Sequence, residues 1–342
     1  MRLIVAIVVA VIPAVASAQD VRPKPANVEA TINRGLDFLV KDALAWKKKH
    51  NCASCHHAAL VIWSMREAKQ RGHGVDEPVL AELTKWLAES GDGKFRLARP
   101  ASAPKAASAG AVHFALALEA DPKPDAVSQK GLKLLLKTVE SEQTEKGSWA
   151  CWPETRPPIF GNSDETLTAL ATLAVLLAAA AGDDAAKAAR DKGIKWLAET
   201  KTDDDPQSIA VRLVLWKRLG RPAKEWQPLA QRIKERQNAD GGWSQAKGMA
   251  SDGWATGQAL YALAHAGIKP NEPAIARAHA FLIKTQRKDG SWPMTSRPTT
   301  PGGKGSTSLI PITGAGSAWA VLGLVRSTSQ AETGAAPDRG GK

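Results

Sequence analysis

Gln237-Asn-Ala-Asp-Gly-Gly-Trp243 is the stretch that decides the fold of this chain. Its polar residues stop a preceding helix, its two glycines allow a tight reversal, and Trp243 fills the turn. Ser251-Asp-Gly-Trp254 then leads into a helix of small residues that runs to Gly267. The stretch therefore predicts one half of a helical hairpin.

The same pattern returns after about 50 residues. Lys284-Thr-Gln-Arg-Lys-Asp-Gly-Ser-Trp292 repeats the turn, and Gly316-Ser-Ala-Trp-Ala-Val-Leu-Gly-Leu324 repeats the helix after it. Self-similarity at a fixed spacing is typical of repeat proteins, in which each unit packs on its neighbours. We therefore expect a chain built from stacked hairpins.

Earlier copies can be traced back from these two. The signature of the first helix of a hairpin occurs at Gly35-Leu-Asp-Phe-Leu39, Leu83-Thr-Lys-Trp-Leu87, Gly131-Leu-Lys-Leu-Leu135, Gly193-Ile-Lys-Trp-Leu197 and Ala278-His-Ala-Phe-Leu282. The partner helices are expected to begin near Cys55, Ala106, Ser163, Asp205, Asp252 and Gly314. One hairpin cannot bury its own apolar stripe, and six hairpins of this length tend to close into a ring. The predicted fold is all-α, a single α/α toroid of about six helical hairpins.

Length and composition suit one large globular domain or two ordinary ones. The 342 residues are 44% hydrophobic and 23% charged, and 12 Trp stand against 5 Phe and 1 Tyr. Several Trp hold equivalent places in the repeat, which indicates packing in the turns. The net charge of +12 is scattered, and no basic run with interleaved aromatic residues suggests a nucleic-acid partner.

The N-terminus has the features of a secretory signal peptide. Residues 1–18 hold a basic start, an apolar core and a small-residue cleavage site that ends at Ala18. We expect an N-terminal extension at 19–30, the toroid at 31–327 and a disordered tail at 328–342, without an integral membrane span. The mature protein is expected in the periplasm or at the cell surface.

The turn at 237–243 and its relative at 286–292 resemble the repeats of squalene and hopene cyclases and of protein prenyltransferases. The resemblance implies inner and outer rings of six helices, with a cavity at the mouth where the inner helices start. It also implies a small or lipid-like ligand in that cavity. The chain is long enough for a single toroid, whereas triterpene cyclases resemble two such domains joined together.

Cys52-Ala-Ser-Cys55-His56 carries the sharpest chemical signal. In an exported protein this spacing is typical of covalent c-type haem attachment, in which both thiols bond to the haem and His56 binds the iron. A Cys52–Cys55 disulfide, a zinc site that uses His56 or His57, and coincidence are the alternatives. Cys151 is expected to be a buried thiol, or else to complete a metal site with the other two cysteines.

The remaining metal ligands are less clearly indicated. His57 adjoins His56 and cannot reach the opposite face of the same iron. The candidates for a sixth ligand are Met65, His113, Met249, Met294 or an open position. We favour His113, although a lone histidine on an apolar stripe is more often a core residue. Protein prenyltransferases bind zinc through Asp, Cys and His of late repeats, and this chain has no matching Asp and Cys pair.

An acidic cluster, Thr202-Asp-Asp-Asp205, precedes the fourth inner helix. It resembles the Asp-x-Asp-Asp cluster of triterpene cyclases, where crowded carboxylates hold a proton for an alkene. By this resemblance Asp204 is the proton donor and Asp205 its neighbour. Thr202 and Pro206 depart from that pattern, and a solvated helix cap explains the same residues.

Polar groups also precede the other inner helices and would form a polar rim around an apolar cavity. They are Asn162-Ser-Asp-Glu165, Gln207-Ser208 and Asp252. The first expectation is a haem protein that transfers electrons to a redox partner or acts on a small or lipid-like molecule. A cofactor-free cyclase or lyase, and a non-catalytic binder of lipid, glycan or protein, are the alternatives.

Overall fold

A computed structural model describes residues 25–50, 53, 55–90, 109–121, 123–151, 158–159, 163–298 and 308–328. These residues form α-helices, one π-helical turn and an isolated bridge between Ser244 and Ser251, and no strand occurs among them. The signal peptide and the disordered tail expected from the sequence lie outside this part of the chain. Within it, no helix has the length and apolar character needed to cross a bilayer.

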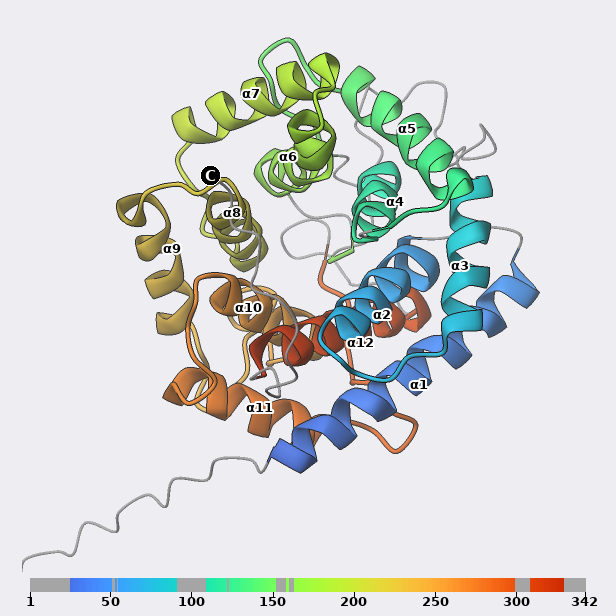
Figure 1. Ribbon diagram of the computed structural model, residues 1–342. Coiled ribbons are helices and arrows are strands. Elements are labelled where there is room, and N and C mark those ends of the chain that lie inside the picture. The colour runs from blue at the N-terminus through green and yellow to red at the C-terminus, as the bar shows by residue number, and fades with distance from the viewer. Residues whose placement is uncertain are drawn as a thin grey trace, which may run out of the picture.

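The helices form two concentric rings (Figure 1). The outer ring consists of α1 (Pro25–Lys49), α3 (Glu77–Ser90), α5 (Ala126–Ser141), α7 (Asp184–Glu199), α9 (Ala223–Glu235) and α11 (Pro273–Thr285). The inner ring consists of the π-helical turn η1 (Cys55–Ala59) with α2 (Leu60–Gln70), α4 (Ala109–Glu119), α6 (Asp164–Ala180), α8 (Pro206–Arg218), α10 (Gly253–His265) and α12 (Ile310–Ser327). Outer and inner helices alternate along the chain, so each hairpin contributes one helix to each ring.

Contacts between the first and last hairpins close the ring. Helix α12 packs against both α10 and α2, and α1 meets α11 (Figure 1). The prediction of a single all-α toroid of six hairpins is confirmed. Helix α1 begins at Pro25, so it takes in residues 25–30, which the sequence analysis assigned to an N-terminal extension.

The repeated turns share one hydrogen-bond geometry around tryptophan. The indole N–H of Trp243 donates to the carbonyl oxygen of Ile233 at 2.7 Å, and its backbone N–H donates to Thr256 Oγ1 at 3.0 Å. Trp149 and Trp292 make the equivalent pairs of bonds. Each tryptophan therefore joins the two helices of its hairpin, since its indole N–H bonds to the outer helix before the turn and its backbone N–H bonds to the inner helix after it. A buried indole N–H needs such a partner.

Backbone conformation explains why a glycine stands two residues before each of these tryptophans. Gly147, Gly241 and Gly290 have φ values of 95°, 90° and 92°, a region that favours glycine. A Cβ atom added to Gly241 would lie 2.6 Å from the carbonyl oxygen of Arg277 on the next outer helix. The turn thus lies directly against the following hairpin, which only glycine permits.

Inner helices carry small residues because they are covered on all sides. Helices α10 and α12 make the closest approach, since a Cβ atom added to Gly257 would lie 2.1 Å from the carbonyl oxygen of Trp319. One turn after Trp319 on α12, Gly323 also lies against the backbone of Gly257. The lack of side chains at Gly257 and Gly323 therefore permits the close approach of α10 and α12.

Candidate functional site

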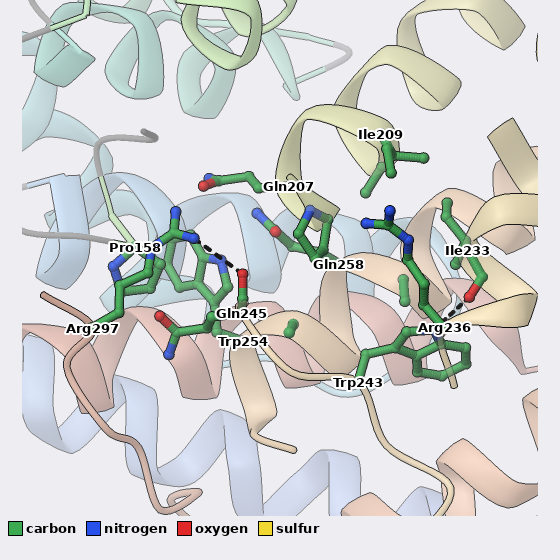
Figure 2. A pocket seen from close by; sticks show the side chains of 14 residues that line it. Pro158, Gln207, Ile209, Ile233, Arg236, Trp243, Gln245, Trp254, Gln258 and Arg297 are labelled. Atoms are coloured by element: carbon green, nitrogen blue, oxygen red, sulfur yellow. Dashed lines mark hydrogen bonds between the residues drawn. The ribbon is translucent and has the colours of Figure 1, made fainter. Parts of the chain in front are cut away.

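A pocket opens between the starts of α8 and α10, at the mouth where the inner helices begin (Figure 2). We call it the mouth pocket. The room inside it for water-sized groups is small, about 20 Å³, and the larger empty space between its walls includes open solvent. Its walls combine apolar groups with the polar side chains of Gln207, Gln245, Gln258 and Arg297. The cavity expected at the mouth of the toroid is therefore present as an apolar pocket with a few polar groups, the usual character of a ligand site.

A second pocket, which we call the lumen pocket, lies further inside the ring. Its walls come from five inner helices, α2, α6, α8, α10 and α12, and include Trp63, Leu170, Leu173, Val214, Tyr261 and Trp319. Ala210 and Gln258 line both pockets, so the two adjoin.

Four aromatic side chains meet at this junction. Trp319 lies edge-on to Trp63, Tyr261 and Trp254, with ring centroids 5.4, 5.7 and 6.0 Å apart. Edge-to-face packing fixes the rings relative to one another. It also presents negative π faces that attract a positive charge.

Asp252 is the buried carboxyl beside the mouth pocket. It caps α10, where Oδ1 accepts the backbone N–H of Ala255 at 2.8 Å and Oδ2 accepts Nε2 of Gln245 at 2.6 Å. Burial raises the pKa of Asp252 to about 6, although these two donors and the charge of Arg297 oppose the rise. The sequence analysis named Asp252 only as part of the polar rim.

The acidic cluster divides between two places. Asp205 caps α8 through the backbone N–H of Ser208, and its Oδ1 pairs with Nη1 of Arg297 at 3.0 Å. The side chain of Asp204 is 87% exposed and pairs with Arg232 and Arg236. The hydrogen bond from Arg232 and the charge of Arg236 lower the pKa of Asp204. Asp205 thus adjoins the mouth pocket, whereas Asp204 faces solvent as a carboxylate.

Glu165 adds a buried ion pair to the rim. Its Oε1 lies 2.7 Å from Nε of Arg212, so the pair joins α6 to α8. Its Oε2 accepts the backbone N–H of Asp203 at 2.6 Å. Burial raises the pKa of Glu165, while these two donors oppose the rise. Because both side chains are already paired, we assign them a structural role.

Two histidines lie at the start of the first inner helix. His56 and His57 are buried in η1, and Nε2 of His57 lies 2.9 Å from Oδ2 of Asp42 on α1. The ring of Trp46 stacks on His57 at 4.3 Å and meets His56 edge-on at 4.9 Å. Cys52 and the side chain of Cys55 lie outside the described residues.

Three of the other proposed metal ligands are buried side chains. His113 is buried in α4, and Met65 and Met294 are buried in the core. Cys151 is half-buried, and its backbone N–H donates to Asp164. Within the described ranges, no group of three or more His, Cys, Asp and Glu side chains could hold a metal ion.

Sequence reasoning missed Arg297, Gln245 and Gln258 as site residues. Gln245 and Arg297 follow plug tryptophans by two and five residues, in segments without periodicity. Of the three, only Gln258 could have been recognised from the sequence, because it is a polar residue within the apolar run of an inner helix. A polar residue at such a position, nine-tenths or more buried, indicates a group that faces the lumen.

Comparisons with known proteins agree with this architecture. Residues 179–286 match the family model for the squalene-hopene cyclase N-terminal domain. No curated protein matches the chain in sequence. The family match covers the repeats that contain α7 to α11, and therefore the helices of the mouth pocket.

Solved structures share the fold over most of the chain. The type II terpene cyclase MstE from Scytonema, in a variant complexed with its substrate geranylgeranyl dihydroxybenzoate, is 13% identical and has a TM-score of 0.57 over 88% of this chain and 97% of its own. The same enzyme without ligand is 15% identical, with a TM-score of 0.56 over 89% and 98%. A protein from Actinoplanes is 15% identical, with a TM-score of 0.56 over 88% and 100%. The chain is thus similar in fold to a type II terpene cyclase over nearly the whole length of that enzyme.

Proposed function

We propose that this protein binds an isoprenoid-like molecule in the lumen pocket and cyclises it by protonation. The observation that carries the proposal is the cluster of Trp63, Trp254, Tyr261 and Trp319 where the polar mouth meets the apolar lumen. A fold alone does not define an activity. The family match and the substrate held by the Scytonema enzyme support this choice of chemistry over others.

The chemistry needs an acid, an alkene and a surface that stabilises a carbocation. We assign the acid to Asp252, because it is buried beside the mouth pocket and its pKa of about 6 leaves a protonated fraction at neutral pH. Transfer of that proton to an alkene of the chain near the mouth pocket would form a carbocation, which π faces stabilise. A second alkene would close the ring with its electron pair. Loss of a proton to the Asp252 carboxylate or to water would end the reaction, so the product is an isomer of the substrate.

The test is incubation with geranylgeranyl dihydroxybenzoate, geranylgeraniol and squalene, followed by chromatography and mass spectrometry. We expect products of unchanged mass with fewer alkenes from one of the three. Asp252→Asn should abolish their formation and retain ligand binding, while Asp191→Asn on the outer helix α7 serves as the matched control. Equal turnover in Asp252→Asn and the parent protein would refute the assignment of the acid.

A covalent haem at Cys52, Cys55 and His56 is our second proposal. The buried histidine pair that follows the two cysteines favours it, because the donor set has the type and order of c-type haem attachment. A haem held there would supply one-electron redox chemistry. His56 would bind the iron, and Trp46 would hold the imidazole ring of His56 in place.

A visible spectrum tests the haem proposal directly. The protein should be produced in cells that attach haem in the periplasm, then denatured and extracted with acid acetone. Haem that stays with the chain, and that the Cys52→Ala, Cys55→Ala double variant lacks, would support the proposal. A colourless protein with bound zinc, or with a Cys52–Cys55 disulfide, would end it.

A further inference from the structure

Only one nitrogen of the Arg297 guanidinium donates hydrogen bonds to the described residues. The side chain is 4% exposed, and Nη1 pairs with Asp205 and with the carbonyl oxygen of Gln245, each at 3.0 Å. Nε and Nη2 are buried and have no hydrogen-bond partner among the described residues. These two atoms form one edge of the guanidinium, with parallel N–H groups that match the two oxygens of a carboxylate.

Other buried polar atoms without a described partner surround the same space. Nε1 of Trp254 and Nε2 of Gln258 are donors, and Oε1 of Gln207 and Oε1 of Gln245 are acceptors. All four side chains line the mouth pocket together with Arg297, and Figure 2 shows the ends of Gln207, Gln258 and Arg297 directed into it. A buried polar atom without a partner is energetically unfavourable, because it has given up its hydrogen bonds to water. So many around one pocket indicate a ligand that satisfies them.

The charges nearby limit the ligand to a low negative charge. Arg297 already faces Asp205, and Asp252 lies on the other side of Gln245. Arg236, the second cation of the pocket wall, pairs with Asp204. Asp204 pairs with Arg232 as well, so three arginines at this edge of the pocket face the carboxylates of Asp204 and Asp205. The one positive charge left over can be offset by a single carboxylate, whereas a diphosphate would add negative charge that nothing here compensates.

We propose that the mouth pocket is a head-group site, in which the Nε and Nη2 edge of Arg297 binds the carboxylate of an amphiphile whose apolar chain enters the lumen pocket. Trp254 and Gln258 donate further hydrogen bonds to the carboxylate. A hydroxyl on the same head group would donate to Gln207 or Gln245. This inference rests on the proposed function for the apolar chain, and it names the substrate class as an isoprenoid or similar lipid that carries a carboxylic acid.

The test compares ligands that differ only in the head group. Affinities of geranylgeranoic acid, geranylgeraniol and geranylgeranyl diphosphate are measured by tryptophan fluorescence and calorimetry on the full chain. We expect the acid to bind at least about tenfold more tightly than the alcohol and the diphosphate, as a charged, bidentate hydrogen bond implies. Arg297→Lys keeps the charge but lacks the paired edge, and it should reduce the preference for the acid to within about twofold.

A second variant guards against a fold defect in Arg297→Lys. Trp254→Phe keeps an aromatic ring and removes the indole donor, so it should weaken binding of the acid about threefold to tenfold and binding of the alcohol by a smaller factor. Equal affinity of the parent protein for acid and alcohol, equal losses for both ligands in Arg297→Lys, or tighter binding of the diphosphate would overturn the proposal.

Benzoate, which has the carboxylate and no chain, separates this inference from the proposed function. Binding of benzoate is followed by NMR in the parent protein and in Arg297→Lys. If benzoate binds only to the parent and no long-chain ligand binds, the head-group site stands and the lumen proposal fails. If the chains bind without regard to the head group and benzoate does not bind, the head-group site fails and the lumen proposal stands.

Discussion

The side-chain amide of Gln286 donates a 3.0 Å hydrogen bond to the carbonyl oxygen of Thr31, which lies 255 residues earlier in the chain. The same amide donates to the carbonyl oxygen of Gly290 in its own turn. Gln237 and Gln143 make the equivalent bonds to the next outer helix, at Ala274 and Ala189. The glutamine of the last turn therefore uses the ordinary contact between repeats to join the two ends of the ring.

Gln286→Ala should destabilise the protein by about 1–3 kcal/mol, because it leaves two part-buried carbonyl oxygens without their donor. Urea unfolding measures the change in the free energy of unfolding. Gln231→Ala, on the exposed face of α9, is the control and should change it by less than about 0.5 kcal/mol. Equal effects in the two variants would contradict the role of Gln286 in closing the ring.

Trp243→Ala and Trp292→Ala should each destabilise the protein by about 3–5 kcal/mol. Each change removes a buried indole together with a hydrogen bond to the preceding helix. Trp226→Ala is the matched control, since that indole is half-buried on α9 beneath the ammonium of Lys217. Losses below about half a kcal/mol for both turn variants would show that the tryptophans do not hold the turns.

Asp252 makes stability depend on pH in a defined direction. Its pKa is raised from 3.8 to about 6 in the folded protein, so the folded state binds a proton that the unfolded state has lost between these values. Stability from this group is therefore highest below about pH 4 and falls by about 3 kcal/mol as pH rises through 6. Asp252→Asn keeps a good helix cap and should remove this loss.

Denaturation in urea between pH 4 and pH 7 gives the difference between parent and variant. Other carboxyl groups contribute equally to both proteins, so only the difference reports on Asp252. A difference that is constant across this range would mean that Asp252 titrates as an ordinary surface carboxyl.

We expect the exported protein to begin at Gln19, because residues 1–18 have the order of a signal peptide and end in a small-residue site at Ala18. Mass spectrometry of the protein from its native cells, before and after export, gives the N-terminus. Ala18→Arg should block cleavage, while Ala26→Arg, beyond the site, should not. Mature protein that retains Met1 would contradict export by this route.

The fold could be predicted from sequence because each residue of the turn has a local task. Glycine permits the positive φ of the turn, tryptophan fills the space between the helices, and glutamine bonds to the turn and to the next outer helix. The residues 237–243 therefore specify their own local structure. Ring closure followed from the number of repeats. The start of α1 at Pro25 was missed because the first helix extends beyond the repeat signature.

The candidate site was less accessible to sequence reasoning. The run of three Asp residues at 203–205 drew attention to Asp204, yet arginines on α9 hold that carboxylate in solvent. Asp252 is buried instead, because Gln245 and Arg297 approach it from segments that follow two different turns. Such convergence depends on how neighbouring repeats are stacked, and no spacing within one repeat reveals it.

Photolabelling measures most directly whether the lumen pocket holds an apolar chain. A geranylgeranyl ligand with a diazirine at the chain end is bound, irradiated and located by peptide mass spectrometry, with unlabelled ligand as competitor. The account predicts competable labels in α2, α6, α10 and α12, on peptides that contain Trp63, Leu170, Tyr261 or Trp319. Labels spread over the outer helices α3, α5 and α7, without competition, would contradict it.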